Sequence, residues 1–146
     1  TSAYAGMQWK PLYYLSTVMN AQYDNLFANK SSQQLLLGEE SGLLGFPNFY
    51  YAGKARVLFS AEQRLFPPFE FGTVVPAFAV FVNAGNTYDS YDAVDLNNMH
   101  YAVGVGLRLG ATRSVQKVVN HINLAWPLGE KNLSGVTFGV RASKSL

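Results

Sequence analysis

Few residues in this chain could carry out chemistry. It has no Cys, and its two histidines are His100 and His121. A thiol nucleophile, a disulfide and a Cys-based metal site are therefore excluded. Two imidazoles with neither a third ligand nor a nucleophile beside them give little support for catalysis. We therefore expect no enzymatic activity and no cofactor.

An acidic run gives a second, weaker indication of chemistry. Asp89, Asp92 and Asp95 lie in the Asp- and Asn-rich segment 85–98. Their spacing does not match a standard calcium-binding loop, in which ligands occupy alternate positions before a bidentate Glu. The composition is instead typical of a solvated loop.

A glycine pair, Gly104 and Gly106, could suggest a phosphate-binding loop. Both residues fall on one face of an alternating segment, and no helix follows them, so a nucleotide site is not indicated. Glycine inside a strand usually marks close approach by another segment. We therefore expect these two glycines to leave room for a neighbouring part of the chain.

The composition is unusual for a soluble domain. Charged residues make up 14% of the 146 residues, against about 25% in typical globular domains, and aromatic residues also reach 14%. The net charge of +2 is too small to indicate nucleic-acid binding. Few charges with many aromatics and glycines suit a wall that faces lipid on one side and water on the other.

Six segments alternate between apolar and polar residues with the two-residue period of a β-strand. They are 14–24, 53–66, 73–84, 100–109, 120–128 and 135–146. No segment indicates a helix, and turns or loops join the strands in succession. The pattern predicts an antiparallel up-and-down sheet of the kind found in barrels.

The alternation also assigns side chains to two faces. The residues expected to face lipid are Val57, Phe59, Val80, Val105, Leu107, Leu124 and Phe138. The residues expected to face the lumen are Lys54, Arg56, Glu62, Arg64 and Arg108. Glu62 and Arg64 could pair with charges on neighbouring strands, such as Arg56 or Arg108, or could hold a loop.

The segment 34–47, QLLLGEESGLLGFP, does not alternate, yet it is too apolar for a loop on a wet surface. We expect Leu43 to Phe46 to fold into the barrel interior and to pack there. The neighbours expected for it are Asn83, Glu62 and the glycine pair.

Short motifs in a fixed order resemble the C-terminal barrel half of the bacterial surface antigen superfamily. This superfamily includes outer-membrane protein assembly factors and two-partner secretion transporters. The matching segments are Leu43-Leu44-Gly45-Phe46, Glu62-Gln63-Arg64, Phe81-Val82-Asn83-Ala84-Gly85, Gly104 to Arg108, Asn123 to Leu128, and the terminal hydrophobe Leu146. Each motif is weak alone, but the ordered set is fairly specific.

The chain departs from the family pattern at two positions. In the family, an arginine of the loop inside the barrel lumen pairs with an aspartate on the barrel wall. This chain has Leu44 and Asn83 at the two positions. Losing one partner would strand a buried charge at about 3–5 kcal/mol, whereas losing both can be nearly neutral. We therefore expect the loop to dock through apolar packing and amide hydrogen bonds.

The resemblance implies an all-β, antiparallel, up-and-down transmembrane β-barrel, of which residues 1–146 form the C-terminal part with about six strands and a lumen-folded loop. Upstream strands and POTRA domains are expected before Thr1, because known barrels start at about eight strands. The implied location is the bacterial outer membrane. The implied partners are the lipid bilayer, a client or passenger protein, and periplasmic or lipoprotein partners.

The implied function is insertion of outer-membrane proteins or translocation of a passenger protein. The implied sites are the lumen-loop motif (Gly42, Leu43, Leu44, Gly45, Phe46), the loop-docking wall (Glu62, Arg64, Phe81, Asn83, Gly85, Gly104, Gly106, Arg108), and a seam at the last strand (Gly135, Gly139, Leu146). Two alternatives remain open. One is a barrel that carries a fused upstream enzyme of patatin-like type, and the other is a soluble β-barrel that binds a small ligand.

Overall fold

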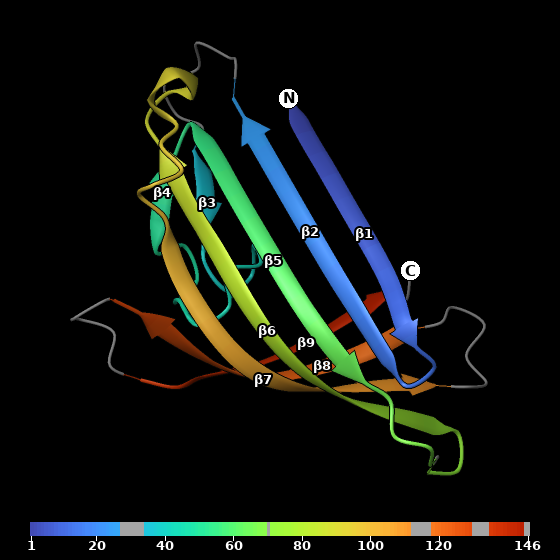
Figure 1. The fold of residues 1–146 in the computed structure, drawn as a ribbon. Helices are drawn as coiled ribbons and strands as arrows, with labels where there is room; N and C mark the ends of the chain where they lie inside the picture. The colour runs from blue at the N-terminus through green and yellow to red at the C-terminus, as the bar shows by residue number, and fades with distance from the viewer. Residues whose placement is uncertain (27–33, 70, 112–117, 130–134, 145–146) are drawn as a thin grey trace.

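The chain forms a sheet of long antiparallel strands with a short hairpin beside it (Figure 1). The computed structural model describes residues 1–26, 34–69, 71–111, 118–129 and 135–144. The strands are β1 (Ser2–Leu12), β2 (Leu15–Asn25), β3 (Leu35–Leu37), β4 (Tyr51–Gly53), β5 (Ala55–Leu65), β6 (Val74–Tyr88), β7 (His100–Ala111), β8 (Val118–Leu128) and β9 (Thr137–Lys144).

The long strands follow one another in the order β1-β2-β5-β6-β7-β8-β9, and each pairs antiparallel with the next. The predicted all-β antiparallel class is therefore confirmed. The sheet is open, with β1 at one edge and β9 at the other. A closed barrel is thus not formed by the described residues.

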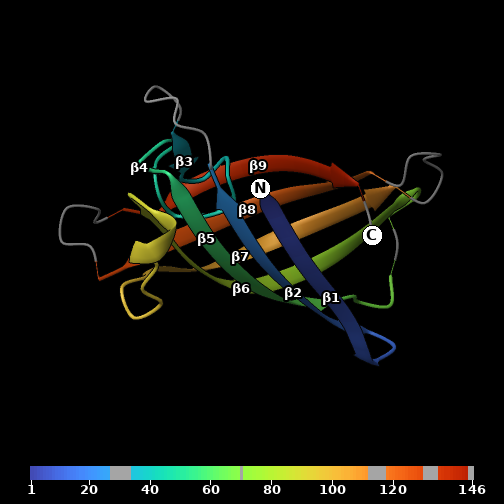
Figure 2. The same cartoon turned by 90° about the horizontal axis from the view of Figure 1, so that it is seen from above.

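The short strands β3 and β4 pair with each other and interrupt the up-and-down order between β2 and β5. They flank residues 38–50, which we call the inner loop. Seen from above, the sheet is strongly curved, and β3, β4 and the inner loop lie on its concave side, between β5 and β9 (Figure 2). Strand twist produces such curvature in large sheets.

The pairing register puts the alternating residues on two faces as the sequence predicts. The convex face carries apolar side chains, which are exposed at Phe59, Val80, Val105, Leu124 and Phe138. The concave face carries most of the polar and charged side chains.

Two residues expected on an exposed apolar face are less exposed than predicted: Leu107 is half-buried, and Val57 is buried. It is only 5% exposed and clusters with Ala55 and Tyr88, against which Val94 and Met99 pack. The connection after β6 folds back over this end of the sheet and covers it. Alternation assigns a residue to a face, but it does not reveal what a distant loop lays over that face.

The segment 85–98 differs from the predicted solvated loop. Strand β6 continues to Tyr88, and a 3-10 helix, η1 (Tyr91–Ala93), follows. The Tyr88 hydroxyl donates to the Asp95 carbonyl at 2.5 Å. No helix of the described residues is long and apolar enough to cross a membrane.

The prediction of six strands missed β1 and the short β3 and β4. In β1, Ala3, Ala5 and Met7 pair with outward residues of β2, whereas Tyr4 and Gln8 pair with inward ones. Alanine contributes little to an apolar pattern, so the alternation of this strand was not recognised. β3 lies within the segment 34–47, where three consecutive leucines hide any period.

Candidate functional site

The inner loop is closed by its own backbone. The Glu39 amide donates to the Phe46 carbonyl at 3.1 Å, and the Leu43 amide donates to the Gly38 carbonyl at 3.0 Å. The Gly38 amide also donates to the Ser41 hydroxyl at 2.8 Å. The segment therefore forms a compact unit that can dock on the sheet as one body.

Two glycines of the inner loop adopt backbone conformations that side chains disfavour. Gly42 has φ +113° and Gly45 has φ +95°. A Cβ on Gly45 would lie 3.1 Å from the Ala102 Cβ and 3.4 Å from the Ala125 Cβ. The loop backbone therefore lies directly on two small side chains of β7 and β8.

An apolar cluster holds the inner loop on the concave face. Leu37, Leu43 and Phe46 are fully buried and pack with Leu58 of β5 and Ala102 of β7. Burial of such a side chain contributes about 1.5–3 kcal/mol. The docking of Leu43 and Phe46 is therefore hydrophobic.

Gly85 of β6 leaves space for the apolar cluster that holds the inner loop. A Cβ at this position would lie 3.1 Å from Leu58 Cδ1 and 3.4 Å from Leu37 Cδ2. A side chain there would push against the cluster that holds the hairpin.

The inner loop also contacts β9. The Thr137 hydroxyl donates to the Gly45 carbonyl at 3.2 Å. Nη2 of Arg141 donates to the carbonyls of Glu39 and Glu40. Nothing in the sequence connected Thr137 or Arg141 with the loop.

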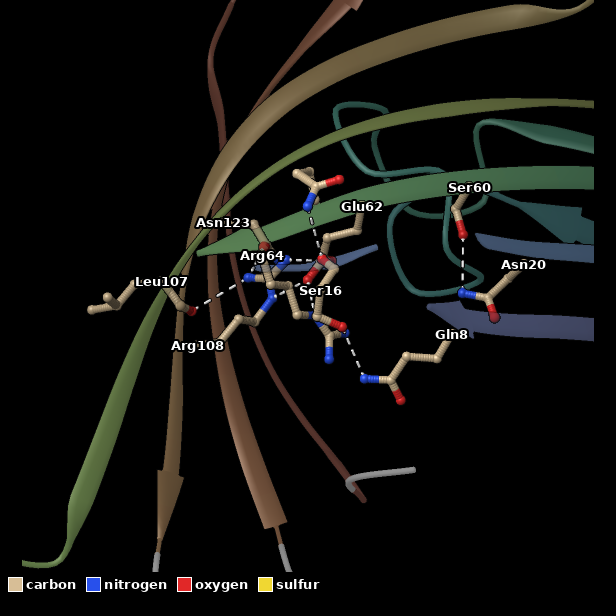
Figure 3. Close-up of polar contacts among 10 residues, drawn as sticks. Gln8, Ser16, Asn20, Ser60, Glu62, Arg64, Leu107, Arg108 and Asn123 are labelled. Atoms are coloured by element: carbon tan, nitrogen blue, oxygen red, sulfur yellow. Dashed lines mark hydrogen bonds and ion pairs between the residues drawn. The ribbon is translucent and has the colours of Figure 1, made fainter. Parts of the chain in front are cut away.

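A charge cluster lies on the concave face below the inner loop (Figure 3). Arg108 donates to both carboxylate oxygens of Glu62, at 2.9 Å from Nε and 2.7 Å from Nη2. Its Nη1 donates to Asn123 Oδ1 at 2.7 Å, and Arg64 Nε donates to Glu62 Oε1 at 2.5 Å. Arg108 is only 3% exposed. Of the two roles considered, Glu62 thus pairs with a charge on another strand, Arg108, whereas the described bond of Arg64 is to Glu62 of its own strand.

The glycine pair makes room for side chains of the wall rather than for the inner loop. A Cβ on Gly104 would lie 2.3 Å from Phe81 Cζ, and one on Gly106 would lie 2.4 Å from Arg108 Nη1. The Arg108 guanidinium carbon also lies 6.0 Å from the centre of the Phe81 ring. The close approach was predicted, but its partner was not, because alternation says nothing about which side chain lies across a glycine.

A second ion pair, between Arg56 and Asp24, also contacts the hairpin of β3 and β4. Arg56 donates to Asp24 Oδ2 at 3.0 Å from Nε and 2.5 Å from Nη2. Its Nη1 donates to the Leu36 carbonyl at 2.8 Å. Lys54 precedes β5 and is exposed.

Asn83 departs from the expected mode of docking. It is buried, and among the described residues its Nδ2 has no hydrogen-bond partner. The expected amide hydrogen bond to the loop is thus not made by this nitrogen. Leu44 and Asn83 both line a cavity of about 400 Å³ between the inner loop and the charged wall.

The residues assigned to the seam lie in different surroundings. Gly139 is buried, and a Cβ there would collide with the Glu39 carboxylate. Gly135 is exposed, with no described atom within 4 Å of its Cβ direction. Leu146 lies outside the described residues.

The two histidines lie in different surroundings. The His100 ring stacks on the Tyr51 ring at 4.2 Å between centroids, and the Tyr51 hydroxyl is 3.0 Å from His100 Nδ1. His121 lines the cavity beside the charge cluster. In the described part of the chain, no group of three or more His, Asp or Glu is placed to hold a metal ion.

Comparison of the chain with family models, curated proteins and solved structures finds no significant match. The site is therefore defined by geometry: an apolar loop docked on the concave face of an open sheet, with a cavity between this loop and an arginine–glutamate cluster.

Proposed function

We propose that the chain forms part of an outer-membrane β-barrel that inserts outer-membrane proteins or translocates a passenger protein. The observation that carries this proposal is the division between the two faces of the sheet. Large apolar side chains are exposed on the convex face of several neighbouring strands, whereas Arg56, Glu62, Arg64 and Arg108 lie on the concave face. Barrel walls in lipid have this alternation.

The docked inner loop gives the second line of support. A plug of Leu37, Leu43 and Phe46 occupies the concave side and packs on Leu58 and Ala102 of the wall. The ordered motifs that resemble the surface antigen superfamily fall on this loop and on the strands beneath it. The proposed location is accordingly the outer membrane, with lipid outside and water inside.

The proposed mechanism needs no covalent chemistry. A strand at the edge of an open sheet presents unpaired backbone amides and carbonyls, and an incoming extended segment can pair with them. β1 and β9 are the edges of the described sheet. Hydrogen bonding at such an edge would template a client strand before its release into the bilayer.

A soluble barrel that binds a small apolar ligand is less well supported. It would need an apolar interior and a polar exterior. Here the exterior carries exposed Phe59, Val80 and Val105, and the interior holds the nearly fully buried Arg108.

The proposal is tested with the full-length protein in proteoliposomes and an unfolded outer-membrane protein as client. The readout is the protease-resistant, folded client in the bilayer; a passenger that is translocated appears instead in the opposite compartment. We expect Leu43→Asp to lower either yield, because it places a charge in the buried cluster. Leu36→Asp is the matched control, since Leu36 is exposed.

Equal yields with the intact protein and with empty liposomes would refute the proposed function. Equal losses in the two aspartate variants would show that the docked inner loop has no special part in it.

A further inference from the structure

The two edges of the sheet are attached differently. At the β1 edge, all residues except Pro11 are exposed, and the described hydrogen bonds of β1 lead to β2 and its ends. At the β9 edge, the strand pairs with β8 and also contacts the inner loop. The described residues thus give β9 a second attachment.

Three successive inward positions of β9 form this attachment. Thr137 bonds the Gly45 carbonyl, the space in front of Gly139 holds the Glu39 carboxylate, and Arg141 bonds two loop carbonyls. The contacts join segments about 100 residues apart in the chain, since 102 positions separate Arg141 from Glu39.

Arg141 is the strongest of these contacts in kind. Its guanidinium is a charged donor, and hydrogen bonds with a charged partner exceed neutral ones in strength. The acceptors are backbone carbonyls of Glu39 and Glu40, in the turn that the bond from the Glu39 amide to the Phe46 carbonyl closes. A displacement of β9 would therefore act on the whole loop.

We propose that Arg141 is a positioning residue that couples the inner loop to β9, so that docking of the loop and pairing of β9 stabilise each other. The role of this coupling rests on the proposed function: it makes the β9 edge, rather than the β1 edge, the one whose readiness to accept an added strand depends on the loop. Such coupling is reciprocal by thermodynamic linkage.

The first test follows exposure of the wall beneath the loop. Ala102 is fully buried, and Gly45 lies over it. We introduce Ala102→Cys into a version of the full-length protein from which any Cys outside this chain has been replaced, and we measure its rate of maleimide labelling in detergent micelles. We expect Arg141→Ala to raise this rate by about threefold or more, because the donor is charged but the bonds are solvent-exposed, which weakens them.

Two variants serve as controls for this labelling. Arg141→Lys keeps a charged donor and should restore part of the protection. Arg64→Ala removes another arginine of the concave face, whose described bond is to Glu62 and not to the loop, and it should leave the rate unchanged. Equal rates in Arg141→Ala and Arg64→Ala would overturn the proposal.

The second test runs in the opposite direction. Phe46→Ala removes the largest buried side chain of the inner loop. Amide hydrogen exchange should then accelerate at Gly139 and Arg141 of β9, whose amides face β8, but stay unchanged at Ala3 and Ala5 of β1, whose amides face β2. Equal acceleration at both edges would contradict the coupling.

Neither test depends on client insertion or translocation. If labelling and exchange behave as expected while the client assay fails, Arg141 still couples the loop to β9 and the proposed function is wrong. If the client assay succeeds while labelling ignores Arg141, the proposed function stands and the coupling is wrong.

Discussion

Leu44 and Asn83 both line the cavity beside the inner loop. In the proposed relationship to the surface antigen superfamily, these positions correspond to an arginine and an aspartate. We expect Leu44→Arg alone and Asn83→Asp alone each to destabilise the docked loop, because each places a charge there without a dedicated partner. Together they should recover much of the loss. The coupling free energy should be about 0.5–3 kcal/mol, as for contacting residues, measured by urea unfolding of the full-length protein in micelles.

A double variant whose effect equals the sum of the single effects would show that positions 44 and 83 do not meet. The observed surroundings of Asn83 sharpen this prediction. Its Nδ2 is buried without a described partner, and an unsatisfied buried donor is costly. Arg64, Arg108 and Arg141 line the same cavity, so the double variant asks whether a carboxylate at position 83 pairs with an arginine at position 44 in addition to these.

The cluster of Glu62 and Arg108 gives a second prediction. Glu62→Leu should cost about 3–5 kcal/mol of unfolding free energy, because it leaves the buried Arg108 without its anion. Arg64→Met should cost far less, because its side chain is 22% exposed and Glu62 keeps Arg108 as partner. Comparable losses in denaturant midpoints would show that Arg108 does not depend on Glu62.

Contacts of single residues were only partly predictable from the sequence. Alternation put Glu62, Arg64 and Arg108 on one face, and pairing with Arg108 was one of the two options considered. The bond from Arg141 to the inner loop was not predictable, because its acceptors are backbone carbonyls. Any residue type supplies such carbonyls, so the sequence carries no sign of them.

Among the strands, β7 depends on a glycine at a defined position. A Cβ at Gly104 would lie 2.3 Å from the Phe81 ring and 2.5 Å from the Leu124 carbonyl oxygen. Gly104→Ala should therefore cost about 1–3 kcal/mol, as overpacking does. Gly135→Ala should be close to neutral, because no described atom lies near that Cβ.

Thermal unfolding of the two alanine variants in micelles measures this difference. A neutral Gly104→Ala would mean that Phe81 can leave its place without cost, and the packing of β6 on β7 would need revision. Neither glycine adopts a positive φ. A loss of stability in Gly104→Ala therefore reports the lack of space for a Cβ and not a strained backbone conformation.

Strands with mixed apolar and polar faces were predicted well, and the weakly patterned ones were not. β5 was predicted within a few residues, because its charged side chains all fall on one face. β1 was missed, because Ala3, Ala5 and Gly6 give small amplitudes on both faces. Val57 is covered by the connection between β6 and β7. Alternation within a strand does not show which connection will cover one of its residues.

For the molecule as a whole, the curved sheet and its two faces are the basis of the proposed function. The sequence predicted the antiparallel class, a loop that folds onto one face of the sheet, and about six strands, which are too few to close a barrel. The described sheet is accordingly open between β1 and β9. Closure depends on what pairs with these edges, and no pattern within the strands encodes that partner.

The most direct measurement is spin-label accessibility along the sheet of the full-length protein in a bilayer. Single Cys variants at Val80, Val105 and Leu124 report the convex face, and variants at Ser60 and Gln22 report the concave face. We predict that the convex labels collide mainly with oxygen, which concentrates in lipid, and the concave labels mainly with a water-soluble nickel complex. The reverse pattern, or nickel access on both faces, would contradict the account of this chain as a lipid-facing barrel wall.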